Sequence, residues 1–417
     1  IVAEQFNSKA VIFERFRTAM VPIGDYQVEF VGTRKEVYDG KTRKPIVTEG
    51  TLEDDINRRD FTVNSIAASL NKDTFGNILD LFNGVEDLKK QILVTPLDPI
   101  ITYADDPLRM MRAARFASQL KFQIEEKSFE AIKEISDKIK IISQERISDE
   151  LLKILESEKP SIGLGILFKT GILKYIFPEL DELAGAEIKQ EGDKVFGHKD
   201  VFWHTLKVVD NISKNTNNVW LRFAALMHDI AKPRTKRYVE GTGWTFHGHE
   251  EIGARMQKKI FRRLKLPMEH LKYVETLVRL HQRPMVLVDS DVSDSAIRRL
   301  AASAGDSLQD LFTLCRADIT TKNPNKSSKY INNYEIVFQK VIDVQEKDAL
   351  RAFQSPVRGE EIMKICDIKP CKMVGSIKTE IEEAILEGII PNDYEQAKDY
   401  FLTNKINWME KYSNQLR

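Results

Sequence analysis

The sequence is poor in cysteine, has no excess of one charge and contains no long apolar run, and each lack excludes a class of protein. Its three cysteines, Cys315, Cys366 and Cys371, form no Cys-x-x-Cys pair, and an odd, scattered set argues against a disulfide framework. No segment approaches the roughly 18 apolar residues of a membrane span, and no signal-peptide pattern opens the chain. We therefore expect a cytoplasmic protein without a membrane partner.

The balance of charge argues against a protein that binds nucleic acid through an overall basic surplus. Lysine and arginine together number 63, the same as aspartate and glutamate, so the chain as a whole has no basic surplus. Any contact with a nucleic acid must then come from local clusters of positive charge. The 417 residues are 42% apolar and 30% charged, which is ordinary for a soluble folded chain of about two to four domains.

The order of the patterns along the chain predicts an α+β fold that is mostly α. Strand patterns occur only near the N-terminus, at residues 28–31 after a turn signal at Gly24, and at residues 78–81 after Gly76. Between them, residues 64–70 predict a short helix. Apolar residues then recur with a helical period from about residue 105 almost to the end. The sequence thus predicts a small α/β part followed by a long helical body.

Residues 51–64 (TLEDDINRRDFTVN) form the densest cluster of charge in the chain. Arginine offers planar, permanently charged donors that match the oxygens of a triphosphate, and aspartate can hold those arginines or accept from a ribose hydroxyl. The pattern therefore indicates a site for a polyanionic ligand. An alternative is a salt-bridged helix start, with Asp60 capping a helix that begins near Thr62.

Residues 102–116 (TYADDPLRMMRAARF) place a second cluster of acids and arginines on a predicted helix. Pro107 suits the first helical position with Asp106 as its cap, so Asp106, Arg109 and Arg112 follow one another along one face. A carboxylate beside a guanidinium can read cytosine or adenine, because both bases set an amino donor next to a ring-nitrogen acceptor. Guanine and uracil present a carbonyl and an N–H there. The alternative is a capped helix with an internal salt bridge.

The histidines are the third feature, because all seven lie between residues 198 and 281. His228 and Asp229 end an apolar helical run, and burying such groups costs free energy unless they are paired. Imidazole nitrogens with carboxylate oxygens suit a divalent transition metal. For any single histidine, the alternative is a core position with its hydrogen bonds satisfied.

The two charged clusters resemble motifs of the class II CCA-adding tRNA enzymes and bacterial poly(A) polymerases. Residues 58–64 match the family's RRDFTxN motif, and residues 105–109 match its EDxxR motif with Asp105 in place of glutamate. Residues 145–151 match its ERIxxEL segment, which braces helices through Glu145, Arg146 and Glu150. The resemblance implies nucleotide-binding residues for sugar and phosphates (Arg59 and Asp60, with Arg58 and Asp55), for base reading (Asp106 and Arg109) and for phosphate or base contact (Arg112).

The histidine set resembles an HD domain, whose metal ligands run His, His-Asp, Asp. The resemblance implies the ligands His204, His228, Asp229 and Asp318, with His249 and His281 as additional candidates. It also implies four parts: the remainder of a nucleotidyltransferase head (1–95), a helical neck with the nucleotide-recognition domain (96–195), an HD domain (196–345) and a helical tail (346–417).

The family's catalytic head motifs are not found in the sequence. Its members hold two Mg²⁺ ions with a DxD pair that follows a GGxVRD loop. The literal triplet Asp289-Ser290-Asp291 lies in the helical half of the chain, and no such loop precedes it. This triplet is typical of a loop or a helix cap. Glu29 is the candidate catalytic carboxylate, a surface strand position being the alternative. We expect the natural protein to continue upstream with both motifs, and residues 1–417 alone to add no nucleotides.

The resemblance implies template-independent addition of C and A to the 3′ end of tRNA from CTP and ATP. Mg²⁺ would serve the transfer and a divalent transition metal the HD domain, and no DNA partner is expected. Two alternatives stay open. One is a poly(A)- or A-adding polymerase, and the other is an HD-domain metal phosphohydrolase with a vestigial nucleotidyltransferase half.

Overall fold

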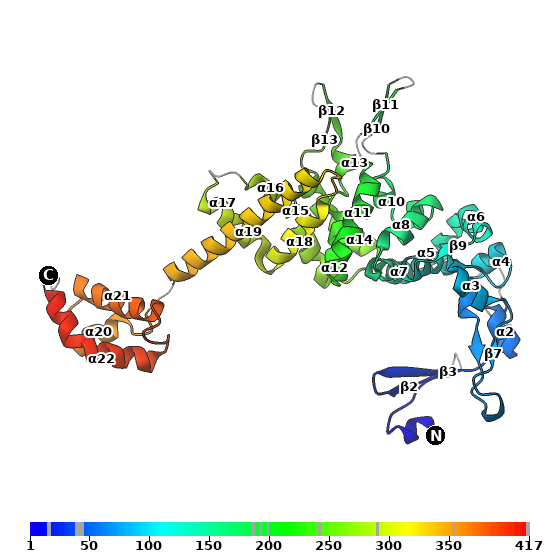
Figure 1. The fold of residues 1–417 in the computed structure, drawn as a ribbon, viewed down its shortest axis with the longest axis horizontal. Helices are drawn as coiled ribbons and strands as arrows, with labels where there is room; N and C mark the ends of the chain where they lie inside the picture. The colour runs from blue at the N-terminus through cyan, green and yellow to red at the C-terminus, as the bar shows by residue number, and fades with distance from the viewer. Residues whose placement is uncertain are drawn as a thin grey trace. The chain divides into compact units, whose positions relative to one another are not determined.

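The computed structural model describes residues 1–14, 18–37, 46–185, 188–191, 194–197, 200–240, 243–288, 292–352 and 355–413 (Figure 1). They form two compact units, residues 1–292 with 299–337, and residues 293–298 with 338–417. Helices dominate both units and short strands lie in the first, which confirms the expected, mostly helical α+β fold. Among the described helices, none combines the length and apolar character that crossing a bilayer requires. The four-part division at residues 95, 195 and 345 stays a prediction.

The N-terminal part contains a three-stranded antiparallel sheet in the order β1-β2-β3. The turn between β2 and β3 places Gly24 at φ +58°, a left-handed conformation that glycine adopts without strain. The strand predicted at residues 28–31 is confirmed within β3, where Glu29 lies opposite Met20. The elements of this part are α1 (Val2–Gln5), β1 (Val11–Phe13), β2 (Thr18–Ile23), β3 (Tyr26–Val31) and the paired strands β4 (Arg34–Val37) and β5 (Ile46–Glu49).

The first charged cluster folds as a short helix followed by a single 3-10 turn. Helix α2 (Leu52–Asn57) begins with a capping box between Thr51 and Asp54. The helix expected at residues 64–70 is wrong, because the chain makes only the turn η2 (Thr62–Asn64) before strand β6 (Ala67–Ala68). Strand β6 pairs with β7 (Ile78–Leu79), the strand predicted at residues 78–81, so its backbone is satisfied across a ladder rather than along a helix.

Close backbone packing holds this cluster against α3 (Gly84–Lys90). Thr62 donates from its amide to the Val94 carbonyl (2.9 Å) and from its hydroxyl to the Asp87 carboxylate (2.7 Å). A side-chain carbon at Gly84 would lie 2.2 Å from the Thr62 carbonyl oxygen, so this approach requires glycine. The residues beside Thr62 are thereby fixed before any ligand binds.

The second charged cluster lies on α5 (Leu108–Leu120), which packs against α7 (Gln144–Glu156) and α8 (Pro160–Lys169). The helix begins one residue later than predicted, yet the Asp106 carboxylate still accepts from the Leu108 amide (3.2 Å). A buried ion pair joins α5 to α7, with Arg115 Nε 2.6 Å from Glu150 Oε2, which is the bracing role expected for Glu150. The neighbouring elements are η3 (Lys72–Thr74), β8 (Ile92–Leu93), α4 (Pro99–Asp105), β9 (Gln123–Ile124), α6 (Glu126–Glu134), η4 (Ser136–Ile141), α9 (Leu173–Ile176) and α10 (Pro178–Asp181).

The histidine-rich segment forms a helical group in which α11, α12, α15 and α18 pack against one another and α14 packs on α15. Buried apolar residues such as Phe223 and Leu277 fill its core, so the ends of these helices are held in fixed positions. Its elements are β10 (Ile188–Glu191), β11 (Lys194–Gly197), α11 (Val201–Ser213), α12 (Val219–Met227), α13 (Lys232–Thr235), β12 (Arg237–Val239), β13 (Gly243–Thr245), α14 (His249–Arg263), η5 (Met268–His270), α15 (Leu271–Leu280), α16 (Arg283–Val286), η6 (Gly305–Ser307) and α18 (Leu308–Asp318). Helices α17 (Asp294–Ala304) and α19 (Pro324–Ala352) each contribute residues to both units.

The second unit has its own core. Its three terminal helices, α20 (Gly359–Cys366), α21 (Lys372–Leu386) and α22 (Tyr394–Lys411), bury Ile362, Ile377 and Phe401 together with other apolar side chains. A hydrophobic core formed by these helices alone indicates a small helical domain.

Candidate nucleotide pocket and metal centre

A pocket of about 590 Å³ lies where the two charged clusters of the sequence meet. Six of its lining residues are arginines and three are acids, so its walls carry net positive charge, as a triphosphate requires. The lining residues are Thr18, Glu29, Val31, Arg34, Arg58, Arg59, Asp60, Asn64, Asp106, Arg109, Arg112, Phe116 and Arg146. Six of the seven predicted nucleotide-binding residues are among them, together with Glu29, the predicted catalytic residue. Asp55 is not.

Asp60 and Arg112 join the two clusters directly. The buried Asp60 carboxylate accepts from Arg112 Nε (2.7 Å), with Arg112 Nη2 2.6 Å from the same oxygen. Its other oxygen accepts from the Phe61 amide and the Asn64 side-chain amide, both at 3.1 Å. Such charge-assisted bonds fix the orientation of the guanidinium. The capping role considered for Asp60 gives way to this pairing, since the 3-10 turn that follows has no side-chain cap.

Asp55 acts from behind the pocket by holding two arginines. Its Oδ1 accepts from Arg58 Nε (3.0 Å) and Nη2 (2.5 Å), and its Oδ2 from Arg59 Nη2 (3.4 Å). Arg59 also donates to the Asn64 carbonyl (3.0 Å), and its side chain is 46% exposed, so its remaining donors can reach a ligand. The arrangement preorganises positive charge without placing Asp55 against an anion.

The predicted base-reading pair has partners that the sequence did not indicate. Arg109 donates to the carbonyls of Thr102 (2.9 Å) and Arg58 (2.5 Å), which ties α5 to the first cluster. Asp106 Oδ2 lies 3.5 Å from Nη2 of Arg146, on α7. One further nitrogen of Arg146, Nη1, is buried without a hydrogen-bond partner among the described residues. Arg146 thus faces the pocket in addition to its expected role as a brace.

Replacing Asp60 by asparagine should weaken nucleotide binding about tenfold or more, because a mispositioned Arg112 loses at least one charge-assisted bond of about 1.5 kcal/mol. Isothermal titration of the chain with ATP and with CTP measures the change. Glu86→Gln, an exposed acid beside Lys89 and Lys90, is the matched control and should bind as the parent does. Unchanged affinity in Asp60→Asn would contradict the assigned role.

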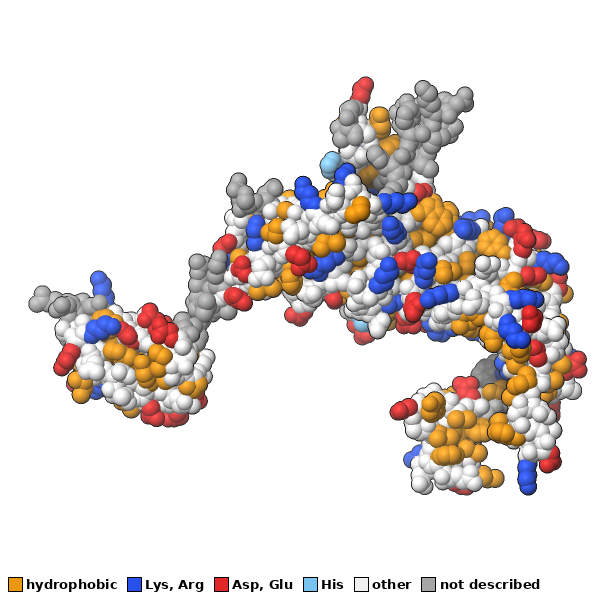
Figure 2. Space-filling view, viewed as in Figure 1, with side chains coloured by type: hydrophobic (Ala, Val, Ile, Leu, Met, Phe, Trp, Pro, Cys, Tyr) orange, Lys and Arg blue, Asp and Glu red, His pale blue; other side chains and the backbone are white. Residues whose placement is uncertain are grey.

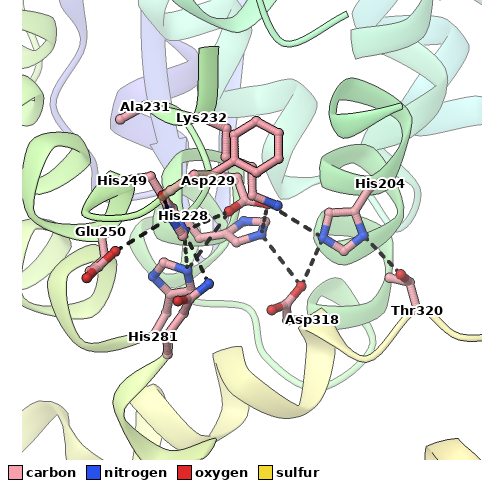
Figure 3. A network of polar contacts seen from close by, with 12 residues as sticks. His204, His228, Asp229, Ala231, Lys232, His249, Glu250, His281, Asp318 and Thr320 are labelled. Atoms are coloured by element: carbon pink, nitrogen blue, oxygen red, sulfur yellow. Dashed lines mark hydrogen bonds and ion pairs between the residues drawn. The ribbon is translucent and has the colours of Figure 1, made fainter. Parts of the chain in front are cut away.

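A second cluster gathers six side chains from five helical elements, and Figure 3 shows how they lie. His204 comes from α11, His228 and Asp229 follow the last turn of α12, His249 begins α14, His281 follows α15, and Asp318 ends α18. All six predicted metal ligands therefore meet in one place, although up to 114 positions separate them, from residue 204 to residue 318. Lys232 joins them as a residue not predicted, with its Nζ 2.8 Å from Asp229 Oδ2.

Burial and charge act against each other in this cluster. Burial alone would lower the pKa of His228, but the carboxylates of Asp229 and Asp318 raise it to about 9. Burial lowers the pKa of His281 to about 4, helped by the nearby charge of His228. Burial would raise the pKa of Asp229, yet the positive charges of His228 and Lys232 hold it well below its usual range.

The cluster fits a divalent transition metal. His228 Nε2 is buried 3.1 Å from Asp229 Oδ2 without hydrogen-bond geometry, and a cation bound by both atoms would satisfy it. Within the described ranges, the groups of side chains close enough to hold an ion are His204, His228 and Asp318, and Asp229, His249 and His281. The carboxylates of the nucleotide pocket form no such group of three among the described residues.

Three models of known protein families match separate parts of the chain. The family model for the poly A polymerase head domain matches residues 1–94, the probable RNA and SrmB-binding site of polymerase A matches residues 121–183, and the HD domain matches residues 201–319. An A-adding tRNA nucleotidyltransferase of Deinococcus radiodurans is 33% identical over 343 residues, which cover 80% of this chain and 75% of that protein. The chain belongs to the tRNA nucleotidyltransferase family.

Further tRNA nucleotidyltransferases and a CCA-adding enzyme are similar to the chain, either in part of its sequence or in its fold. A tRNA nucleotidyltransferase of Schizosaccharomyces pombe is 36% identical over 172 residues, 40% of this chain and 35% of that protein. A tRNA nucleotidyltransferase solved with a primer tRNA and an ATP analogue has a TM-score of 0.57 at 17% identity, over 82% of this chain and 86% of that one. The Bacillus stearothermophilus CCA-adding enzyme solved with CTP has a TM-score of 0.53 at 20% identity, over 97% and 85%.

In this family member, the sequence indicates the charged clusters but not the pocket residues outside them. Arg34, on β4, carries no local signal, and the resemblance of the segment that holds Arg146 indicates only a bracing role for it. Glu29 lies on β3 with an exposed side chain at the pocket, and its catalytic role remains a prediction. The Asp289–Asp291 triplet lies outside the described residues.

Proposed function

We propose that the protein adds C and then A to the 3′ end of tRNA, using CTP and ATP, in the cytoplasm and without a DNA partner. The observation that carries the proposal is the arginine-lined pocket in which Asp106 and Arg109 face the same space as Arg59 and Arg112. An acid beside a guanidinium suits cytosine and adenine, and the remaining arginines suit the triphosphate.

In this proposal the chain's residues bind and orient the nucleotide. Arg59 binds phosphate oxygens, while Asp55 holds Arg59 and Arg58 in place. Asp60 orients Arg112, and the Asp106 carboxylate accepts from the amino group of the base. The proposed cofactor is Mg²⁺, which would supply activation of the 3′ hydroxyl and charge neutralisation of the triphosphate when bound.

The tRNA partner is supported by charge on the helical part of the first unit. Figure 2 shows Lys and Arg side chains spread along that part on the viewed face, with acids between them. The basic groups among them can contact phosphates of a folded RNA without regard to sequence. Binding of tRNA should therefore weaken steeply as salt rises.

The discriminating experiment offers the full-length natural protein three tRNAs, ending before CCA, after the first C and after CC, with each labelled nucleotide alone and in combination. Incorporation of two C and then A supports the proposal. Addition of A to the tRNA ending in CC, with no incorporation of C, supports the A-adding alternative, which is the activity named for the Deinococcus radiodurans relative. No incorporation into any of the three contradicts both.

A second function is favoured by the histidine-aspartate cluster. We propose that this cluster binds a divalent transition metal and acts as a phosphohydrolase centre, with Lys232 supplying positive charge beside Asp229. The bound metal would polarise a phosphoryl oxygen or lower the pKa of a water. Phosphate release that persists in an Asp60→Asn variant and is lost in His228→Ala would separate this activity from the nucleotide pocket.

A further inference from the structure

The hairpin of β12 and β13 concentrates positive charge on an exposed part of the first unit. The cations of residues 232–240 are Lys232, Arg234, Lys236 and Arg237, against the single acid Glu240. The whole chain, in contrast, balances 63 basic with 63 acidic side chains. All residues of β12 are exposed, and Figure 1 shows the two strands standing out from the helices beside them. A local basic surplus on an exposed ribbon is the electrostatic footprint of a site for a polyanion.

Aromatic rings lie between these cations. Tyr238 on β12 is paired with Trp244 on β13, and their ring centroids are 5.3 Å apart in an edge-to-face contact. The Nζ atom of Lys236 lies 4.0 Å from the centroid of the Trp244 ring, a cation–π distance. Tyr238 remains 50% exposed. Since Lys236 and Tyr238 are two positions apart in extended chain, a cation and a half-exposed ring share one face of the hairpin.

Trp244 also has a polar group that a ligand would satisfy. Its indole N–H is buried and has no hydrogen-bond acceptor among the residues that the structure describes. A buried donor in this state costs free energy, which an acceptor oxygen from a bound molecule would offset. Phosphate and ribose oxygens are such acceptors, so this donor favours the same class of ligand as the cations do.

A ring beside cations matches a nucleotide in an unpaired strand. Bases stack on aromatic side chains whatever their identity, and the neighbouring phosphates pair with basic groups. Inside a duplex both faces of a base are already stacked, so double-stranded RNA could use the cations but not the ring of Tyr238. An acidic peptide would likewise use the cations alone. The combination on the hairpin therefore favours a single strand.

We propose that the β12–β13 hairpin is a binding site for unpaired RNA. Tyr238 stacks one base, and Lys236 and Arg237 contact the phosphates beside it. No residue of the hairpin lines the nucleotide pocket, so this site is separate from the one that selects the nucleotide. The choice of RNA over DNA rests on the proposed function, whereas the site itself rests on the hairpin's own residues. It would hold an unpaired segment of RNA without reading its sequence, because every base offers a face for stacking.

The test measures binding of the protein to a short fluorescent oligoadenylate, and to an RNA duplex of the same length, by fluorescence anisotropy. Tyr238→Ala should weaken binding of the single strand about 5- to 150-fold, which corresponds to one lost stacked base. It should leave binding of the duplex unchanged. Tyr238→Phe keeps the ring and should bind the single strand as the parent does. Asp60→Asn, which disturbs the nucleotide pocket, should also bind it as the parent does.

A second variant tests the phosphate contacts and leaves the aromatic pair in place. Arg237→Gln should lower the slope of log Kd against log salt concentration by about 0.7 for the single strand, the effect of one lost phosphate contact. Arg255→Gln is the charge-matched control, because Arg255 is a 74% exposed arginine that pairs with Glu251 on α14. It should leave the slope unchanged.

The outcomes decide the proposal independently of nucleotide addition. Equal binding of the single strand by the parent, Tyr238→Ala and Arg237→Gln would overturn the hairpin site, as would a parent that binds no oligoadenylate. Equal losses for single strand and duplex in Tyr238→Ala would also contradict it, since stacking would not be the cause. If the full-length protein adds no nucleotide while Tyr238→Ala still loses the single strand alone, the proposed function fails and the hairpin site stands.

Discussion

Asparagine at position 106 should abolish most of the preference for CTP and ATP over UTP and GTP. The Asp106 carboxylate accepts only, so it favours bases that present an amino group, whereas an asparagine amide can also donate to a carbonyl of uracil or guanine. A hydrogen bond to a charged group contributes about 1.5–3 kcal/mol, so the ratio of kcat/KM values should fall roughly 10- to 150-fold. The measurement is nucleotide incorporation by the full-length natural protein with each triphosphate separately.

The neighbouring acid supplies the control for this prediction. Asp105 ends α4 and does not line the pocket, so Asp105→Asn should keep the discrimination of the parent. Arg146→Gln removes the arginine 3.5 Å from Asp106 and should lower discrimination by less than Asp106→Asn does, because the acceptor itself remains. If both aspartate variants discriminate equally well, Asp106 does not read the base.

Arg222→Met should lower the stability of the fold strongly, although Arg222 belongs neither to the nucleotide pocket nor to the histidine-aspartate cluster. The Arg222 side chain is buried, and its guanidinium donates to the carbonyls of Leu155, Ser157, Ser213 and Thr216 at 2.7–3.1 Å. Methionine fills similar space and offers no donor, so these acceptors lose their partner at about 1–3 kcal/mol each. We expect the free energy of unfolding to fall by at least about 4 kcal/mol.

Urea unfolding followed by far-ultraviolet circular dichroism measures this change. Arg279→Met is the matched control, because Arg279 pairs with Glu251 at 2.8 Å between side chains that are 39% and 40% exposed. Such a surface pair contributes about 0–1 kcal/mol. Equal stability of the two variants would show that the carbonyls around Arg222 find other donors, and it would contradict the predicted loss.

Predictions from the sequence agree with the structure best where the functional residues lie close together in the chain. The charged run at residues 51–64 and the acid-arginine spacing at Asp106, Arg109 and Arg112 are visible in short segments, and six of seven predicted nucleotide-binding residues line one pocket. The six predicted metal ligands also lie together, although up to 114 positions of the chain separate them. The helix expected at residues 64–70 failed for the opposite reason, since a short apolar stretch takes its form from the strand it meets, here β7.

The sequence by itself determined which types of residue form the two sites, because the acids, arginines and histidines stand out in the sequence without knowledge of the fold. Only the tertiary structure decided how they are joined. The Asp60–Arg112 pair spans 52 positions, Arg146 reaches Asp106 from another helix, and the two oxygens of Asp229 meet imidazoles from α11, α12, α14 and the end of α15. Those contacts depend on how buried apolar faces pack, and packing is a property of the whole core rather than of any segment.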